Sequence, residues 1–152
     1  MLDEAAEAMK ESARSAAVGV GWQTVSVQTA ARTEIKDITR DIAQLVAQAG
    51  LESGLCQLYV PHTTAGILIN ESDDSDVARD IGEALDRLVP RTAAYKHYEG
   101  NADSHIKASL VGSSAVVPIE AGKLGLGRWQ GIFFCEFDGP RRRTVKVHIS
   151  RD

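Results

Sequence analysis

The spacing of apolar residues constrains this fold most strongly, because it changes repeatedly between the period of a strand and that of a helix. Val25 and Val27 alternate with polar neighbours, which predicts a half-buried strand over residues 22–30. Helical and further strand-like segments follow, and we therefore expect an α+β fold with mostly antiparallel strands and helices covering the sheet faces. The other predicted strands are residues 54–60, 65–70, 114–120, 130–138 and 143–149.

Two main helices and one short helix are predicted between the strands. Residues 37–50 and 72–90 place apolar side chains on one helical face, and residues 104–112 could form the short helix, with Ile106 and Leu110 one turn apart. The turn sequence GPRR joins the last two strands, which predicts a hairpin. The predicted buried stripes are Ile38, Ile42, Leu45 and Val46 in the first helix and Val77, Ile81, Leu85 and Leu88 in the second.

Length and charge narrow the class of protein. A chain of 152 residues suggests a single domain, which we expect over residues 21–152 after a loosely ordered or helical extension at residues 1–20. The net charge of −4 argues against a general nucleic-acid binder, and no apolar run is long enough to cross a membrane. The start of the chain is unlike a signal peptide, and Cys56 and Cys135 lie in apolar runs. We therefore expect a cytoplasmic protein with reduced core thiols.

Three of the four histidines fall in loops, where functional sites usually lie. His97 and His105 bracket an acidic loop that contains Glu99, and His62 lies in a turn. These imidazoles could bind zinc with water in the open position, or act as acid, base or phosphate donors. Their spacing matches no compact ligand motif, so unrelated surface histidines are the alternative. The fourth, His148, alternates with apolar residues and is expected to face solvent.

Charged clusters provide further candidates, each with a structural alternative. Asn70 precedes Glu71 and Asp74 at a strand-to-helix junction, where carboxylates could cap the helix or bind magnesium. The glycine-rich residues 120–131 could form an ordinary connection or hold an anion through backbone amides. The arginines at 141–143 could form a solvated patch or a phosphate clamp.

Taken together and in this order, the motifs resemble one known family. PHTTAGILINES, YEGNADSHIKASLVGSS and GLGRWQGIFFCEFDGPR, with a signature running from Ser114 to Ile132, are similar to the YjbQ-like family, whose members are often labelled secondary thiamine-phosphate synthase enzymes. The resemblance covers residues 22–149 and departs from the family pattern at Arg128, where threonine is usual. It implies a compact α+β fold rich in β-sandwich, and a homotrimer.

The resemblance also implies a reaction and a set of site residues. The reaction joins a pyrimidine-methyl diphosphate to a thiazole phosphate and releases pyrophosphate, as a secondary activity. The expected catalytic residues are His62, His97, His105 and Glu136. The residues expected to bind substrate phosphate are Asn70, Lys107 and Gln130 from the motifs and, by its charge, Arg141.

A divalent metal is expected, and its identity separates the alternatives. Magnesium would assist phosphate departure in a transferase, whereas zinc would indicate a hydrolase or another metalloenzyme. A trimeric binding protein for a phosphorylated metabolite is the third possibility. The expected ligands are Glu71, Asp74 and Glu99 for magnesium, and His62, His97 and His105 for zinc.

Overall fold

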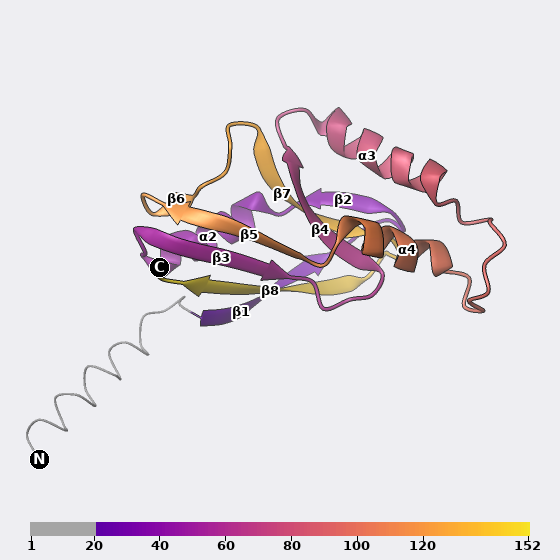
Figure 1. Ribbon diagram of the computed structural model, residues 1–152, viewed down its shortest axis with the longest axis horizontal. Coiled ribbons are helices and arrows are strands. Elements are labelled where there is room, and N and C mark those ends of the chain that lie inside the picture. The colour runs from indigo at the N-terminus through magenta and orange to yellow at the C-terminus, as the bar shows by residue number, and fades with distance from the viewer. Residues whose placement is uncertain (1–20) are drawn as a thin grey trace, which may run out of the picture.

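The structure, a computed structural model, describes residues 21–152 as two antiparallel sheets packed against each other, with helices at their edges and ends (Figure 1). The predicted extension at residues 1–20 lies outside the described residues. The five-stranded sheet has the order β1-β8-β3-β5-β6, and the three-stranded sheet has the order β2-β7-β4. The first sheet comprises β1 (Gly21–Gln28), β8 (Arg142–Ser150), β3 (Ser53–Tyr59), β5 (Ser114–Glu120) and β6 (Lys123–Leu124). The second comprises β2 (Glu34–Asp37), β7 (Gln130–Glu136) and β4 (Ala65–Glu71).

The helices confirm the predicted α+β class. Within residues 21–152 they are α2 (Thr39–Ala49), α3 (Ser75–Leu88) and α4 (Ala102–Val111), and none of them is long and apolar enough to cross a membrane. Asp37 Oδ1 accepts a hydrogen bond of 2.8 Å from the backbone N–H of Thr39 at the start of α2. Gly50 ends this helix in the left-handed conformation at φ 63°, which glycine adopts without strain.

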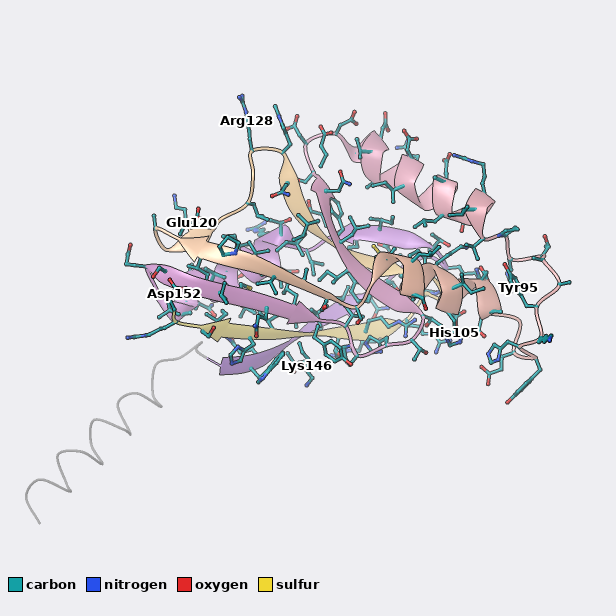
Figure 2. All side chains as sticks on the ribbon, viewed as in Figure 1. Tyr95, His105, Glu120, Arg128, Lys146 and Asp152 are labelled. Carbon is teal, nitrogen blue, oxygen red and sulfur yellow. The ribbon has the colours of Figure 1, made fainter. Side chains whose placement is uncertain are left out.

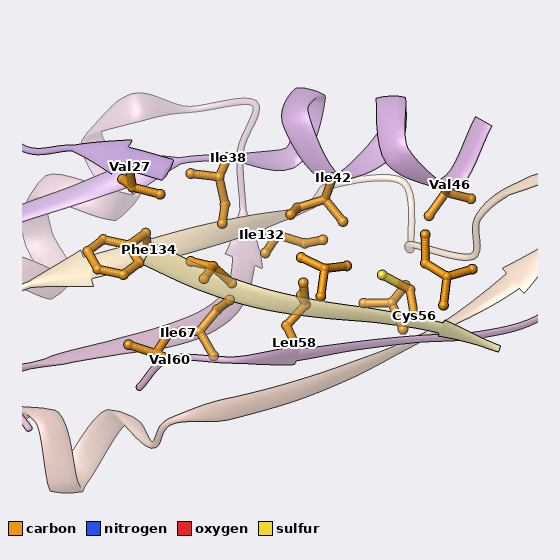
Figure 3. Close-up of a cluster of buried hydrophobic side chains, with 14 of the residues drawn as sticks. Val27, Ile38, Ile42, Val46, Cys56, Leu58, Val60, Ile67, Ile132 and Phe134 are labelled. Carbon is orange, nitrogen blue, oxygen red and sulfur yellow. The ribbon is translucent and has the colours of Figure 1, made fainter. Parts of the chain in front are cut away.

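The core lies between the two sheets and is closed by α2 (Figure 3). Leu58 comes from the five-stranded sheet, Ile67 and Phe134 come from the three-stranded sheet, and Ile42 comes from α2. Each is 2% exposed or less, and burying such a side chain contributes roughly 1.5–3 kcal/mol. The two cysteines are free and buried, as expected, and burial raises the pKa of Cys56 to about 11.

The predicted hairpin between the last two strands is wrong. β7 and β8 are consecutive, but β7 pairs with β2 and β4 whereas β8 pairs with β1 and β3. The reason lies in their burial patterns. Residues 131–136 of β7 are buried on both faces, whereas β8 alternates between buried and more exposed positions. A strand that is apolar on both faces must be covered on both sides, and the crossing at Gly139–Pro140 carries the chain from one sheet to the other.

The predicted buried stripe of α3 is also corrected, and α4 is buried through its polar side chains. In α3 only Gly82 is buried, and Leu88 at its end is 70% exposed. In α4 the exposed positions include Ile106 and Leu110, while the buried ones include Asp103, Ser104 and Lys107. The N-cap of α3 is Asp74, whose side chain accepts a hydrogen bond from the backbone N–H of Asp76. Polar contacts therefore fix α4, while the apolar pair Ile106 and Leu110 lies on its exposed side.

Candidate functional site

Two adjoining cavities lie beside α4, from which His105 projects (Figure 2). The charged cavity has a volume of about 350 Å³, and residues found in it alone include Glu99, Asn101, Asp138, Arg141 and Arg143. The uncharged cavity has a volume of about 420 Å³, and residues found in it alone are Ala65, Ala108, Ser109, Gly112 and Ser113. Both cavities are lined by His62, Thr63 and His105.

Close backbone packing brings α4 to these cavities. The carbonyl of Gly112, which follows α4, accepts a hydrogen bond of 3.0 Å from the backbone N–H of Ile67 in β4. A Cβ atom on Gly66 would lie only 2.6 Å from the same carbonyl oxygen, so a larger residue would push α4 away from β4. The short connection from β3 to β4 carries His62, and this packing places His105 in the same cavities.

His62 is held in one tautomer. The backbone N–H of Thr144 donates a hydrogen bond of 3.0 Å to Nε2 of His62, so Nε2 carries a lone pair and Nδ1 carries the proton. Burial lowers the pKa of His62 from its usual value of 6.5, and the positive charge of Arg143 lowers it further. His62 is therefore a neutral hydrogen-bond donor near pH 7, and its Nε2 is not free to bind a metal.

NMR titration of the histidine side chains should show His62 as the Nδ1–H tautomer at pH 7, with a titration midpoint below 6.5. As the pH falls through 6.5, the unfolded chain gains a proton at this residue and the folded chain does not, so the free energy of unfolding decreases. His62→Gln should remove this part of the pH dependence. A proton on Nε2 at pH 7 would contradict the assignment.

The three predicted zinc-site histidines meet in pairs rather than as a triad. The rings of His97 and His105 lie edge to face with centroids 5.2 Å apart, and His97 Nε2 lies 3.5 Å from Glu99 Oε2. His62 and His105 share both cavities, whereas His97 lines neither. Across residues 21–152, no group of three or more His, Cys, Asp or Glu side chains is arranged to hold a metal ion.

Glu136, a predicted catalytic residue, forms a buried ion pair with Arg143 and does not line the charged cavity. Arg143 donates to both carboxylate oxygens, at 2.8 and 2.6 Å, and the Thr29 hydroxyl and two backbone N–H groups donate to them as well. Burial opposes ionisation of this carboxyl, but the hydrogen bonds outweigh burial and lower the pKa of Glu136. Arg143 also donates to the Thr64 hydroxyl, so Glu136 fixes an arginine at the cavity wall.

Asn101, Asp138 and Arg141 form a second polar group in the charged cavity. Arg141 Nη2 and Asn101 Nδ2 each donate to Asp138 Oδ2 at 2.9 Å. The Arg141 side chain is 54% exposed, and its Nη1 has no protein partner within residues 21–152, so it can bind an anion. Asn101 Oδ1 is buried without a hydrogen-bond partner in the described part of the chain, and a cation or a ligand N–H could satisfy it.

Sequence reasoning did not include Asn101 or Asp138 among the site residues. Both carried a usable signal, because Asn101 lies between the two loop histidines and Asp138 lies two positions after the end of β7. Polar residues at such loop positions are held in place by the adjoining elements. Their pairing across 37 positions of the chain required the fold.

Lys107, predicted to bind phosphate, is 1% exposed and lines neither cavity. Its ammonium group lies 3.1 Å from Asp103 Oδ2 and 2.5 Å from Asp86 Oδ1. Asp103 is also held by two hydrogen bonds of 3.0 Å from Arg32. Burial raises the pKa of Asp103, but the partners Arg32 and Lys107 outweigh it and lower the pKa to about 2. This network joins α3 and α4 to the segment between β1 and β2.

The remaining predicted residues lie away from the histidines. Glu71 pairs with Gln130 at one end of the β4–β7 ladder, while Ala65 pairs with Glu136 at the cavity end. Glu71 lies six positions after Ala65 along β4, which is roughly 20 Å at about 3.3 Å per residue. The predicted magnesium ligands therefore do not gather around Glu99 within one chain. The residues at this distant end are Asn70, Glu71, Asp74 and Gln130.

The fold and the cavities define an α+β sandwich protein with a histidine-lined site beside α4. This chain belongs to the YjbQ-like family, because a family model described as "UPF0047 protein YjbQ-like" matches residues 23–152. The earlier resemblance, drawn from the motifs alone, is thereby confirmed.

Relatives and solved structures support the same membership. The chain is 49% identical to the UPF0047 protein MJ1081 of Methanocaldococcus jannaschii, over 83% of this chain and 91% of the relative. It is 47% identical to the UPF0047 protein YugU of Bacillus subtilis, over 84% of this chain and 97% of the relative. A crystal structure of a YjbQ/UPF0047 family protein from Clostridium acetobutylicum matches with a TM-score of 0.82 and 50% identity, over 84% of this chain and 99% of that one.

Proposed function

We propose that this protein is a transferase that acts on phosphorylated small molecules. The proposed reaction joins a pyrimidine-methyl diphosphate to a thiazole phosphate with release of pyrophosphate, as a secondary activity. The observation that carries the proposal is the charged cavity, in which His62 and His105 lie with the partly exposed guanidinium of Arg141. Such groups favour negative charge, and pyrophosphate departure places negative charge on the leaving oxygens.

Each residue has a role that follows from its position. In the proposed step, the bond between the pyrimidine methylene carbon and the diphosphate oxygen breaks, and its electron pair leaves with pyrophosphate. The thiazole phosphate forms the new bond to that carbon. Arg141 binds the departing phosphate oxygens, and His62 donates from Nδ1–H without changing its charge. His105 is the candidate for proton transfer to the leaving group.

The oxygen donors of the charged cavity fit magnesium better than zinc. Glu99 and Asp138 supply carboxylates, and the unpartnered Oδ1 of Asn101 is a further hard ligand. Glu136 already balances Arg143, so Glu99, Asp138 and Arg141 leave the charged cavity with a net negative formal charge, and a phosphate with its cation suits it better than a bare anion. When bound, magnesium would neutralise charge on the diphosphate. Zinc binding at His62 would require breaking its hydrogen bond with Thr144.

Purified protein, incubated with magnesium and both thiamine precursors, should produce thiamine phosphate. Arg141→Gln should lower kcat/KM by roughly a hundredfold, as for loss of one preorganised donor, and His105→Ala by a similar factor. The matched control is Arg142→Gln, because Arg142 is the exposed neighbour whose Nε donates to Ser26 and which lines neither cavity. Wild-type product no greater than that of His105→Ala would defeat the proposal.

The same assay separates the two alternatives. Stabilisation by a precursor that is never consumed would favour the binding protein, because a bound ligand raises apparent stability by mass action. Hydrolysis that depends on zinc retained through purification without a nickel column would favour the zinc enzyme. We also propose, from the resemblance, that the protein is a cytoplasmic homotrimer. A monomer mass by light scattering at micromolar concentration would overturn the trimer.

A further inference from the structure

We infer that the uncharged cavity is the subsite for the uncharged ring of the substrate, and that Ser109 selects rings that carry an N–H donor. The inference rests on the proposed function, since it assigns to the charged cavity the phosphate end of the same substrate. The two cavities share three residues, and two of these are His62 and His105. We expect the reacting carbon to lie between these two imidazoles.

The division of charge between the cavities is the first observation. Four Asp, Glu or Arg side chains line the charged cavity. Among the described residues, no Asp, Glu, Lys or Arg side chain lines the uncharged cavity. A phosphate in the uncharged cavity would have no charged partner there, whereas an uncharged ring in the charged cavity would leave polar groups unpaired. A substrate with one charged end and one uncharged end therefore has a single favourable orientation.

The small size of the lining residues is the second observation. Ala65, Ala108 and Gly112 line the uncharged cavity, and a Cβ atom on Gly66, next to Ala65, would lie only 2.6 Å from the carbonyl oxygen of Gly112. Because these residues have short side chains, the space of about 420 Å³ is left open to a ligand. Pockets of this size hold compact ligands such as single heterocycles.

The hydrogen bond of Ser109 indicates which kind of ring the uncharged cavity favours. Its hydroxyl donates a hydrogen bond of 2.8 Å to the carbonyl of His105, one turn earlier in α4. A hydroxyl has one proton, so the Ser109 oxygen can only accept from a ligand while this bond persists. The favoured partner is an N–H group on the ring, and a site that accepts such a bond discriminates strongly against rings that lack it.

Binding of two probes, measured by calorimetry with magnesium present, tests the assignment. Pyrophosphate reports on the charged cavity, and the pyrimidine-methyl diphosphate reports on both cavities. Ser109→Leu fills the uncharged cavity at an exposed helix position where leucine is well tolerated. We expect it to weaken binding of the diphosphate precursor by at least about tenfold, with pyrophosphate binding within about twofold of wild type. The matched control is Ser114→Leu, at an exposed residue that lines neither cavity.

Each result has a defined meaning. If Ser109→Leu weakens the binding of both probes equally, or of neither, the separate ring subsite is overturned. Wild-type protein that binds pyrophosphate as tightly as the precursor would also overturn it, because the ring would then add nothing. Failure of wild-type protein to bind pyrophosphate would instead defeat the proposed function, and the inference with it.

Discussion

Glu136→Gln is expected to lower the free energy of unfolding by about 3–5 kcal/mol, the usual loss when one partner of a buried ion pair is removed. Arg143 would keep its charge with only 7% of its side chain exposed, and a neutral amide cannot balance it. Thr29 and two backbone N–H groups would also lose their charged acceptor. Urea unfolding of the variant and the wild type measures the difference.

A double replacement separates the ion pair from simple loss of packing. Glu136→Leu combined with Arg143→Met leaves no uncompensated charge, and it should be more stable than Glu136→Gln. The experiment also tests the sequence-based hypothesis that Glu136 is catalytic. If Glu136→Gln unfolds like the wild type yet loses the transferase activity, Glu136 acts in the reaction and its proposed structural role is wrong.

The positions of Glu136 and Lys107 show why part of the site could not be predicted from the sequence. A charged residue in a motif looks the same whether it faces a ligand or an opposite charge inside the protein. Lys107 meets Asp86, which is 21 positions earlier, and Glu136 meets Arg143 across the crossing from one sheet to the other. Only the fold brings these partners together. The burial of Lys107 argues against the hypothesis that it binds phosphate.

The predicted strands succeeded where the apolar pattern alone decides the structure. Val145, Val147 and Ile149 alternate with less buried residues along β8 and are fully buried, as the pattern predicts. The apolar pattern did not predict the strand pairing. β7 is buried on both faces, and the pattern of apolar residues does not show which strands cover it. The apolar pattern carries no information on the burial of α4, where Asp103 and Ser104 are buried through hydrogen bonds rather than by apolar contact.

The predicted site residues lie in two separate places in the structure. His62 and His105 were predicted to meet although 43 positions separate them, and they line the same cavities. Asn70 and Glu71 follow His62 closely in the chain, yet β4 carries them to its opposite end. A strand of seven residues spans roughly 20 Å or more, so nearness in a motif does not imply nearness in a site.

The second large effect is expected at Asp103, where Asp103→Asn should lower the free energy of unfolding by about 3–5 kcal/mol. The side chain is fully buried and holds both Arg32 and Lys107, so a neutral amide leaves two cations short of negative charge. The chain contains a matched control in Glu83, which also pairs with a cation four positions later, Arg87, but at 3.8 Å on the exposed face of α3. Glu83→Gln should change stability by less than about 0.5 kcal/mol.

The pH dependence provides a second measurement on the same pair of variants. The pKa of Asp103 is lowered from 3.8 to about 2 in the folded protein, so its contribution to stability is present above pH 3.8 and is lost as the pH falls toward 2. Wild-type protein should therefore lose stability across this range, while Asp103→Asn should lose less. If Asp103→Asn and Glu83→Gln have equal small effects at pH 7, the buried network does not hold α4 in place, and the position of His105 must depend on the backbone contacts of Gly112 instead.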